Sequence, residues 1–188
     1  MSICYLNGKF LDLKEAKISP LDRGFLFGDA IYEVIASYNN KPFKIEDHLD
    51  RLFINLKDIK ISVNYSRQEV KNILESVIEK NDLSNQIIYL QISRGHEDIR
   101  DHIPGPSPSP TIFVCSFPLK NIPNAQTTSI KASLKKDFRW RKSNIKSTSL
   151  LANVMYKIQA SEEDFFEIIL QENGYITEGA VSNVFCVK

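Results

Sequence analysis

Residues 144–154 read NIKSTSLLANV, and in this stretch a polar segment carrying Lys146 gives way to apolar residues at helical spacing. We predict a helix over residues 147–160 whose apolar side faces inward with Leu150, Leu151, Val154, Met155 and Ile158. Lys146 would then lie at the positive end of that helix, with further cations nearby in the sequence at Arg139, Arg141 and Lys142. Both features favour a neutral amine, the form that Schiff-base chemistry requires. The alternative is a solvated surface lysine.

Downstream of this helix the sequence predicts two strands joined by a turn. Residues 165–171 form an apolar run, and Gly174 turns the chain back into residues 175–177. The block that follows, residues 177–183, reads TEGAVSN and has Glu178 at a strand end before small residues. Such an acid can hold a ring nitrogen protonated, while small residues let a ligand approach the backbone. An ordinary polar β-turn is the structural alternative.

Upstream, the sequence predicts short strands and two amphipathic helices. Asn7-Gly8 is a strong hairpin signal, and residues 49–59 carry apolar side chains at the i, i+3, i+4, i+7 spacing of a helix. Ser66 and Glu69 form a capping box that begins the second helix. The predicted strands are residues 3–6, 9–13, 30–37, 86–93, 111–117 and 128–134.

The chain has two candidate linkers. One is the segment with prolines at 104, 106, 108 and 110, which cannot join a central strand. The other is PLKNIP at 118–123, which we prefer because the strand before it completes the first run of apolar segments. We therefore predict an N-terminal α/β domain over residues 1–118, a linker over 119–123 and part of a second domain over 124–188, in which a sheet is begun and not finished.

Composition and charge exclude several classes of protein. With 43% hydrophobic and 25% charged residues the chain matches an ordinary globular protein, and its net charge of +1 argues against sequence-independent nucleic-acid binding. Cys4, Cys115 and Cys186 are too widely spaced for a zinc site and indicate free thiols in a reducing compartment. Charged residues from Lys9 onward interrupt the first apolar run, so we expect no signal peptide, no membrane span and a cytoplasmic location.

The segment HEDIRDH, residues 96–102, concentrates ionisable groups. A metal site is disfavoured because His96 and His102 would lie on different faces of a helix. Arg100 and His102 can instead point the same way from an extended loop, where a guanidinium group binds a carboxylate through two hydrogen bonds. A solvated charged loop is the alternative. Arg51, on the polar side of the 49–59 helix, is either a phosphate contact or a surface ion pair.

Read together, five blocks resemble the class IV, fold-type IV pyridoxal-phosphate aminotransferases: FLFGDAIYEVI (25–35), HLDRL (48–52), SRG with RDH (93–102), NIKSTSLLANV (144–154) and TEGAVSNVF (177–185). That family comprises D-amino acid, branched-chain and (R)-amine transaminases and aminodeoxychorismate lyase. The resemblance implies a small N-terminal α/β domain and a C-terminal mixed-sheet domain. Because members of the family continue well past the TEGAVSN block, it also implies that the second domain is truncated here.

The resemblance implies pyridoxal 5′-phosphate as cofactor and assigns residues to it. Lys146 matches the lysine that forms the Schiff base and moves the proton between Cα and C4′. Glu178 matches the acid that pairs with the pyridine nitrogen and keeps it cationic, and Arg51 matches the arginine that binds the phosphate. Ser182 and Asn183 belong to the same cofactor-binding block as Glu178.

The resemblance also implies substrates and a partner. Tyr32, Arg100 and His102 match residues that bind the substrate carboxylate in D-amino acid transaminases, where the arginine and histidine come from the partner subunit of a homodimer. The expected reaction is ping-pong transfer from a D-amino acid such as D-alanine to a 2-oxo acid such as 2-oxoglutarate. Ala180 and Val181 are closer to the lyase or branched-chain pattern, so those activities stay open, as does a non-catalytic chain of the same fold.

Overall fold

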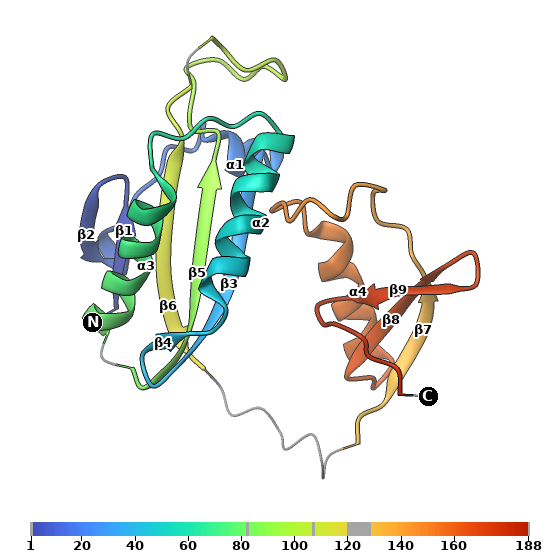
Figure 1. The fold of residues 1–188 in the computed structure, drawn as a ribbon. Coiled ribbons are helices and arrows are strands. Elements are labelled where there is room, and N and C mark those ends of the chain that lie inside the picture. The colour runs from blue at the N-terminus through green and yellow to red at the C-terminus, as the bar shows by residue number, and fades with distance from the viewer. Residues whose placement is uncertain (1, 82, 107, 120–128, 188) are drawn as a thin grey trace. The chain divides into compact units, whose positions relative to one another are not determined.

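The computed structural model describes residues 2–81, 83–106, 108–119 and 129–187. It divides into two compact units, Met1–Lys120 with Asn144–Ser149, and Asn121–Ser143 with Leu150–Lys188. Each unit has its own sheet, so the predicted mixture of helices and two sheets is confirmed (Figure 1). Of the predicted linker, only Leu119 belongs to the described residues. The domain boundaries therefore stay a prediction.

A six-stranded antiparallel sheet forms the frame of the first unit, in the order β2-β1-β6-β5-β3-β4. Its strands are β1 (Ile3–Leu6), β2 (Lys9–Asp12), β3 (Ala30–Tyr38), β4 (Lys41–Pro42), β5 (Asn85–Ser93) and β6 (Thr111–Pro118). The β1–β2 hairpin is confirmed, and Asn7 and Gly8 both have the positive φ, 46° and 93°, that such a two-residue turn requires. β3 pairs with β5 along its whole length, which fixes the strand that carries Tyr32.

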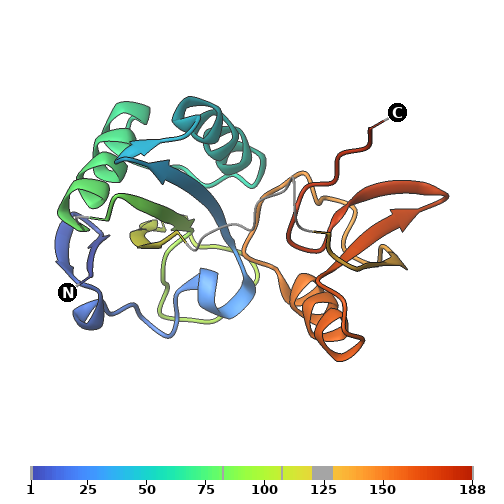
Figure 2. The same ribbon diagram turned by 90° about the horizontal axis from the view of Figure 1, so that it is seen from below.

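Two helices, α2 (Ile45–Asp58) and α3 (Arg67–Asn81), cover one face of this sheet (Figure 2). Both follow the predicted periodicity and bury their apolar sides in one core with Ile31, Ile88 and Leu90 of the strands. The capping box of α3 is confirmed, because the Ser66 N–H donates to the Glu69 carboxylate at 2.7 Å and the Glu69 N–H donates to Ser66 Oγ at 3.2 Å.

Two short helical elements were not predicted, η1 (Leu13–Glu15) and α1 (Arg23–Phe27). The Asp22 carboxylate caps α1 by accepting the Gly24 N–H at 2.8 Å, and Gly28 ends it in the left-handed conformation, φ 65°. A helix this short has no apolar repeat that sequence periodicity could detect. Among all described helices, none has the length and apolar character needed to cross a membrane.

The second unit is a mixed three-stranded sheet with one helix. β7 (Ala132–Lys136) runs parallel to β8 (Glu167–Glu172), β9 (Tyr175–Gly179) is antiparallel to β8, and α4 (Leu151–Glu162) connects β7 to β8. This mixed sheet is the one that the family resemblance implied. Its small core consists of Tyr156, Ala160, Ile168, Leu170 and Ala180, with Phe165 at the margin.

Two predictions about α4 are wrong. The helix begins at Leu151 and not at residue 147, because residues 146–148 pair with β3: Ser147 forms a bridge with Ile31, and the Thr148 N–H donates to the Ala30 carbonyl at 3.1 Å. Its buried side carries Tyr156 and Ala160, whereas four of the five residues predicted to face inward are half or more exposed: Leu151, Val154, Met155 and Ile158. This helix is apolar on more than one side, so its pattern did not identify the buried face.

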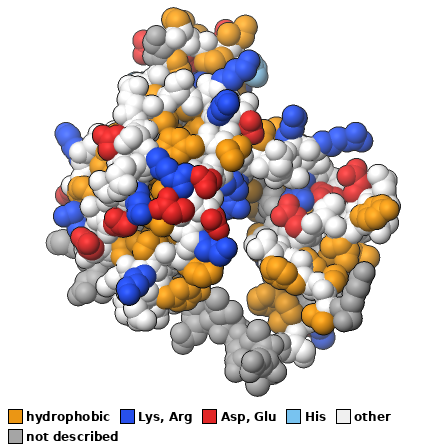
Figure 3. Space-filling view, in the orientation of Figure 1, with side chains coloured by type: hydrophobic (Ala, Val, Ile, Leu, Met, Phe, Trp, Pro, Cys, Tyr) orange, Lys and Arg blue, Asp and Glu red, His pale blue; other side chains and the backbone are white. Residues whose placement is uncertain are grey.

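Acidic and basic side chains alternate over the outer surface of α2 and α3 (Figure 3). Arg67 and Lys71 of α3 each donate to the Glu46 carboxylate of α2 at 2.7 Å, and Arg67 also pairs with Asp50. Each exposed pair contributes at most about 1 kcal/mol. Burial of apolar side chains, and not these ion pairs, therefore provides most of the free energy that packs the helices on the sheet.

We expect Leu52→Ala to lower the free energy of unfolding by about 2–5 kcal/mol, because it leaves a cavity beneath a fully buried position of α2. Ile54→Ala is the matched control on the same helix, where the side chain is 59% exposed, and should cost less than about 1 kcal/mol. Urea unfolding followed by far-UV circular dichroism measures both. Equal losses would contradict the orientation of α2.

Candidate active site

The backbone of Lys146 is fixed on both sides within the first unit. Its N–H donates to Asn55 Oδ1 of α2 at 2.8 Å, and its carbonyl accepts the Tyr32 N–H of β3 at 3.0 Å. The next residue continues this pairing, since Ser147 bridges Ile31. Lys146 is thus held by a helix and a strand that are both part of the main core.

Asn55 is a candidate site residue that the sequence patterns did not single out. It is buried, and it follows Leu52 by three residues on the apolar side of α2. A buried amide must find a hydrogen-bond partner, and here the partner is the backbone of Lys146. The signal was present in the sequence, because an asparagine among the apolar positions of an amphipathic helix indicates a specific polar contact.

The side chain of Lys146 lies against Tyr32. Nζ is 3.4 Å from Tyr32 Oη and 4.4 Å from the centre of the ring, which itself stacks on Tyr89 at a centroid distance of 5.8 Å. Within the described part of the chain, Nζ forms a hydrogen bond with this hydroxyl and no ion pair with a carboxylate. Because α4 begins only at Leu151, Lys146 does not directly precede the helix as predicted, and an effect of the helix dipole on its amine stays a prediction.

Arg51 forms an ion pair with Glu33, a fully buried residue of β3. Glu33 accepts hydrogen bonds from Arg51 Nε at 2.7 Å and Nη2 at 2.6 Å, and His48 Nδ1 lies 2.8 Å from Glu33 Oε2. Burial by itself raises the pKa of Glu33, but the hydrogen bonds of Arg51 and His48 outweigh it and hold that pKa below its usual range. Arg51 is still 47% exposed, and within the described chain its Nη1 is left to donate to an anion.

Arg100 and His102 lie on the loop that joins β5 to β6, the β5–β6 loop, which projects past the end of the sheet (Figure 1). The guanidinium carbon of Arg100 is 4.7 Å from the centre of the Phe27 ring, and the His102 ring is 5.2 Å from it. The structure therefore brings these two side chains together on one aromatic ring of α1. Across the described residues of this single chain, neither has a hydrogen bond or ring contact with Tyr32 or Lys146.

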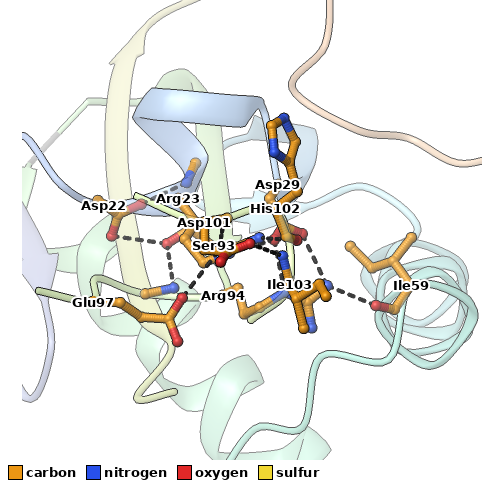
Figure 4. Close-up of polar contacts among 12 residues, drawn as sticks. Asp22, Arg23, Asp29, Ile59, Ser93, Arg94, Glu97, Asp101, His102 and Ile103 are labelled. Carbon is orange, nitrogen blue, oxygen red and sulfur yellow. Dashed lines mark hydrogen bonds and ion pairs between the residues drawn. The ribbon is translucent and has the colours of Figure 1, made fainter. Parts of the chain in front are cut away.

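A cluster of paired charges lies at the base of this loop (Figure 4). Asp29 binds Arg94 Nε at 2.7 Å and Arg23 Nε at 3.0 Å. Arg94 also donates to the carbonyls of Ile59 and Lys60 at 2.8 Å, which ties β5 to the C-terminal end of α2. Burial raises the pKa of Asp29, but its hydrogen bonds with Arg94 and Arg23 outweigh burial and hold that pKa below its usual range.

In the second unit, Glu178 lies near the end of β9 and pairs with the buried side chain of Arg139 through Oε1. Arg139 also donates to Asp137 at 2.7 Å, and Thr177 Oγ1 donates to the same carboxylate at 2.9 Å. The Glu178 side chain is 42% exposed, and in the described part of the chain its Oε2 has no hydrogen-bond partner. One carboxylate oxygen is therefore fixed and the other can accept a hydrogen bond.

The turn after Glu178 brings small residues into close contact with one another. The Ser182 hydroxyl donates to Glu167 Oε2 at 2.7 Å, and the Ser182 carbonyl accepts the Gly179 N–H at 2.9 Å. A Cβ at Gly179 would clash with Ser182, whose carbonyl oxygen would lie 2.7 Å away, so only glycine fits there without a shift. Asn183 is exposed. The turn thus needs its small residue for internal packing, whether or not a ligand is bound.

We expect Asp137→Asn to destabilise the second unit in a pH-dependent way. Hydrogen bonds from Arg139 outweigh burial and lower the pKa of Asp137 to about 2. An unfolded aspartate titrates near pH 4, so the ionised group stabilises fully above about pH 4 and this stability is lost as the pH falls toward 2. The variant should lose about 2 kcal/mol at neutral pH, and the difference should shrink below about pH 4.

This difference is measured by urea unfolding at several pH values. The fluorescence of Trp140, the chain's single tryptophan, reports the unfolding. Asp164→Asn is the matched control, because the Asp164 side chain is 96% exposed and its contact with Lys131 is long, 3.6 Å. A pH-independent loss in Asp137→Asn would contradict the ion-pair interpretation.

Comparison with known proteins identifies the family. The profile of amino-transferase class IV matches residues 30–188. D-alanine aminotransferase of Bacillus licheniformis is 36% identical over 97% of this chain and 64% of its own length. The corresponding enzyme of Staphylococcus haemolyticus is 34% identical over 100% of this chain and 67% of its own length. The chain thus spans about two thirds of the length of these curated relatives.

Solved structures share the fold. Branched-chain aminotransferase from Thermoproteus uzoniensis, solved with norvaline, superposes with a TM-score of 0.83 at 21% identity, over 96% of this chain and 63% of that one. A hypothetical aminotransferase from Mycobacterium tuberculosis, solved in its PLP-bound form, gives 0.77 at 16% identity, over 95% and 65%. These identities support the fold alone, but the profile match extends over most of the sequence. The chain belongs to the class IV aminotransferases.

Proposed function

We propose that this chain provides the cofactor lysine and substrate-binding residues of a D-amino acid aminotransferase. The reaction passes the amino group of a D-amino acid such as D-alanine to a 2-oxo acid such as 2-oxoglutarate, in ping-pong order. The observation that carries the proposal is the geometry of Lys146, whose backbone is fixed by Asn55 and β3 while its amine lies beside Tyr32. The D-alanine aminotransferase relatives support the substrate class.

The residues present fit pyridoxal 5′-phosphate, the group bound in the Mycobacterium tuberculosis aminotransferase. Lys146 offers a primary amine for the carbonyl group, Arg51 an unused guanidinium donor for the phosphate, and Glu178 an open carboxylate oxygen for the protonated ring nitrogen. Ser182 and Asn183 are further candidate contacts. When bound, the cofactor supplies a carbonyl that condenses with amines and a ring that withdraws electrons from the substrate Cα.

Different residues of the chain would bind the substrate, orient the binding groups and transfer the proton. Lys146 Nζ would take the proton that leaves the amino acid Cα, pass it to the cofactor carbon C4′, and carry out the opposite transfer in the second half-reaction. Tyr32 Oη, at 3.4 Å, limits where that amine can point. Glu33 orients Arg51 by accepting two of its hydrogen bonds, which turns the remaining donor edge outward. Arg100 and His102 bind the substrate carboxylate.

We further propose a homodimer in the cytoplasm. Two side chains that bind carboxylate on the β5–β6 loop, without a described contact to Lys146 in their own chain, suit a site completed by a second copy. The three cysteines are free, with Cys4 and Cys115 buried in the first unit, which suits a reducing compartment.

A second candidate activity is transamination of branched-chain amino acids, or lyase chemistry on an aminodeoxychorismate. Ala180 and Val181 favour it, because a small buried residue and an exposed apolar one follow the Glu178-Gly179 pair in place of serines. Turnover of L-valine or of aminodeoxychorismate, compared with D-alanine under the same conditions, distinguishes the three activities.

Lys146→Ala should abolish covalent attachment of the cofactor. The purified full-length protein is expected to be yellow, and borohydride should leave a pyridoxyl group on the peptide that contains residue 146, as detected by mass spectrometry. Lys142→Ala is the matched control, since this exposed lysine lies four residues earlier and should leave the label in place. Colourless protein that takes up no added cofactor would contradict the proposal and favour a non-catalytic chain.

Arg100→Ala should raise the KM for D-alanine by about tenfold or more while cofactor attachment is unchanged, because loss of a hydrogen bond to a charged group costs about 1.5–3 kcal/mol. Arg141→Ala, at an exposed arginine outside the β5–β6 loop, is the control and should keep the normal KM. Steady-state kinetics with pyruvate detection measures both. Equal losses in turnover and in cofactor attachment would count against carboxylate binding.

Mixing the inactive Lys146→Ala variant with the impaired Arg100→Ala variant, assayed at a low concentration of D-alanine, tests the dimer. If Arg100 serves the partner's site, a heterodimer of Lys146→Ala and Arg100→Ala subunits contains one site with both residues intact. Activity should therefore return after the variants are unfolded together and refolded. No recovery, with heterodimers present, would mean that each site uses its own Arg100.

A further inference from the structure

We propose that Arg23 is a positioning residue for substrate carboxylate binding, because it holds the backbone of the β5–β6 loop at the residues that carry Arg100 and His102. The inference rests on the proposed function, in which those two side chains bind the carboxylate. Arg23 belongs to α1, lies outside the five sequence blocks and touches neither Lys146 nor Tyr32 among the described residues.

The guanidinium group of Arg23 binds the loop directly (Figure 4). Nη1 donates to the Asp101 carbonyl at 2.6 Å, and Nη2 donates to the His102 carbonyl at 2.9 Å. Arg23 is only 4% exposed, so both bonds form away from water, where a lost hydrogen bond is most costly. The loop backbone is thus fixed at His102 and at the residue that separates it from Arg100.

Other bonds from Arg23 fix its own position and the base of the loop. Nε binds Asp29 at 3.0 Å and Nη1 also binds Glu97 at 3.0 Å, while the backbone N–H of Arg23 donates to the Gly95 carbonyl at 2.8 Å. Glu97 in turn accepts the Gly105 N–H through its other oxygen. One buried arginine therefore links α1 to both arms of the loop.

The Phe27 ring completes this arrangement at the other end of α1. The guanidinium carbons of Arg23 and Arg100 lie 4.9 Å and 4.7 Å from the centre of this ring, and the His102 ring lies 5.2 Å from it. Cations are attracted to an aromatic face, so the ring gives the Arg100 side chain a preferred position. Backbone and side chains of the carboxylate-binding residues are thus both oriented by α1.

Arginine is required at this place because of its planar set of donors. Its contacts are two carboxylates and two carbonyls, reached from three nitrogens of one rigid group. Lysine would keep the positive charge between Asp29 and Glu97 but cannot reach the four acceptors in the same geometry. Arg23→Lys therefore releases the loop while it keeps a positive charge beside the partly buried carboxylates of Asp29 and Glu97.

The test measures KM and kcat for D-alanine in the full-length holoenzyme. Arg23→Lys should raise KM about tenfold, as expected when hydrogen bonds that position a charged group are lost, with a smaller change in kcat and no change in cofactor attachment. The Arg23→Lys/Arg100→Ala double variant should raise KM by clearly less than the product of the two single effects, because Arg23 acts in part through Arg100.

Arg94→Lys is the matched control. Arg94 binds the same Asp29 carboxylate, at 2.7 Å, but donates its other bonds to the end of α2 and not to the β5–β6 loop. The Arg94→Lys variant should lower the melting temperature about as much as Arg23→Lys does, and it should leave the KM for D-alanine unchanged. If Arg23→Lys fails to fold, Glu97→Gln provides a second test. It weakens the contact between Arg23 and the β5–β6 loop without removing the buried cation, so it should also raise the KM for D-alanine.

Three results would overturn the inference alone. The first is a normal KM in Arg23→Lys and Glu97→Gln while Arg100→Ala is impaired. The second is a double variant whose KM rises by the product of the two single effects. The third is an equal rise in KM for Arg94→Lys, because it would reduce the role of Arg23 to general stability. A normal KM in Arg100→Ala would refute the proposed carboxylate site itself, and the inference with it.

Discussion

The two backbone hydrogen bonds of Lys146 are the constraint on which the rest of the site depends. Asn55 of α2 and Tyr32 of β3 hold its amide and carbonyl groups, and both elements belong to the large core of the first unit. A long, flexible side chain can place its amine reproducibly only if its backbone does not move. The apolar packing of α2 on the sheet, which involves no catalytic group, is therefore what fixes the position of the candidate nucleophile.

Paired carboxylates that are buried or only slightly exposed recur wherever the fold must join distant segments. Glu33 joins β3 to Arg51 of α2, Asp29 joins Arg23 of α1 to Arg94 beyond β5, and Asp137 joins the end of β7 to Arg139 and through it to β9. A buried charge without a partner costs several kcal/mol, so each pair strongly disfavours any register in which its partner is displaced. The candidate site residues Arg51 and Glu178 each form such a pair, so their side chains are oriented only when the segments that carry their partners are correctly folded.

The parts of this structure that the sequence predicted are those with a local repeat. The periodicity of α2, the capping box of α3 and the Asn7-Gly8 turn each depend on residues close together in the chain, and all are observed. Residues 146–148 are compatible with a helix start, but pairing with β3, more than a hundred positions away in sequence, determines their conformation. The local spacing around Lys146 and Glu178 is ordinary, so these residues were identified only because five sequence blocks occur in the order found in class IV aminotransferases. Arg23 was not identified, because α1 is too short to show an apolar repeat.

Residues 144–149 also determine how the chain is threaded. Because they belong to the first unit while the residues before and after them belong to the second, the polypeptide passes between the units three times. A protease nick between residues 129 and 143 would leave the Lys146 segment hydrogen-bonded to the first unit and still covalently joined to α4. Neither unit corresponds to one continuous piece of the gene. A recombination event that exchanged the chain from the predicted linker onward would also exchange Lys146, and with it a segment that pairs with β3 of the first unit.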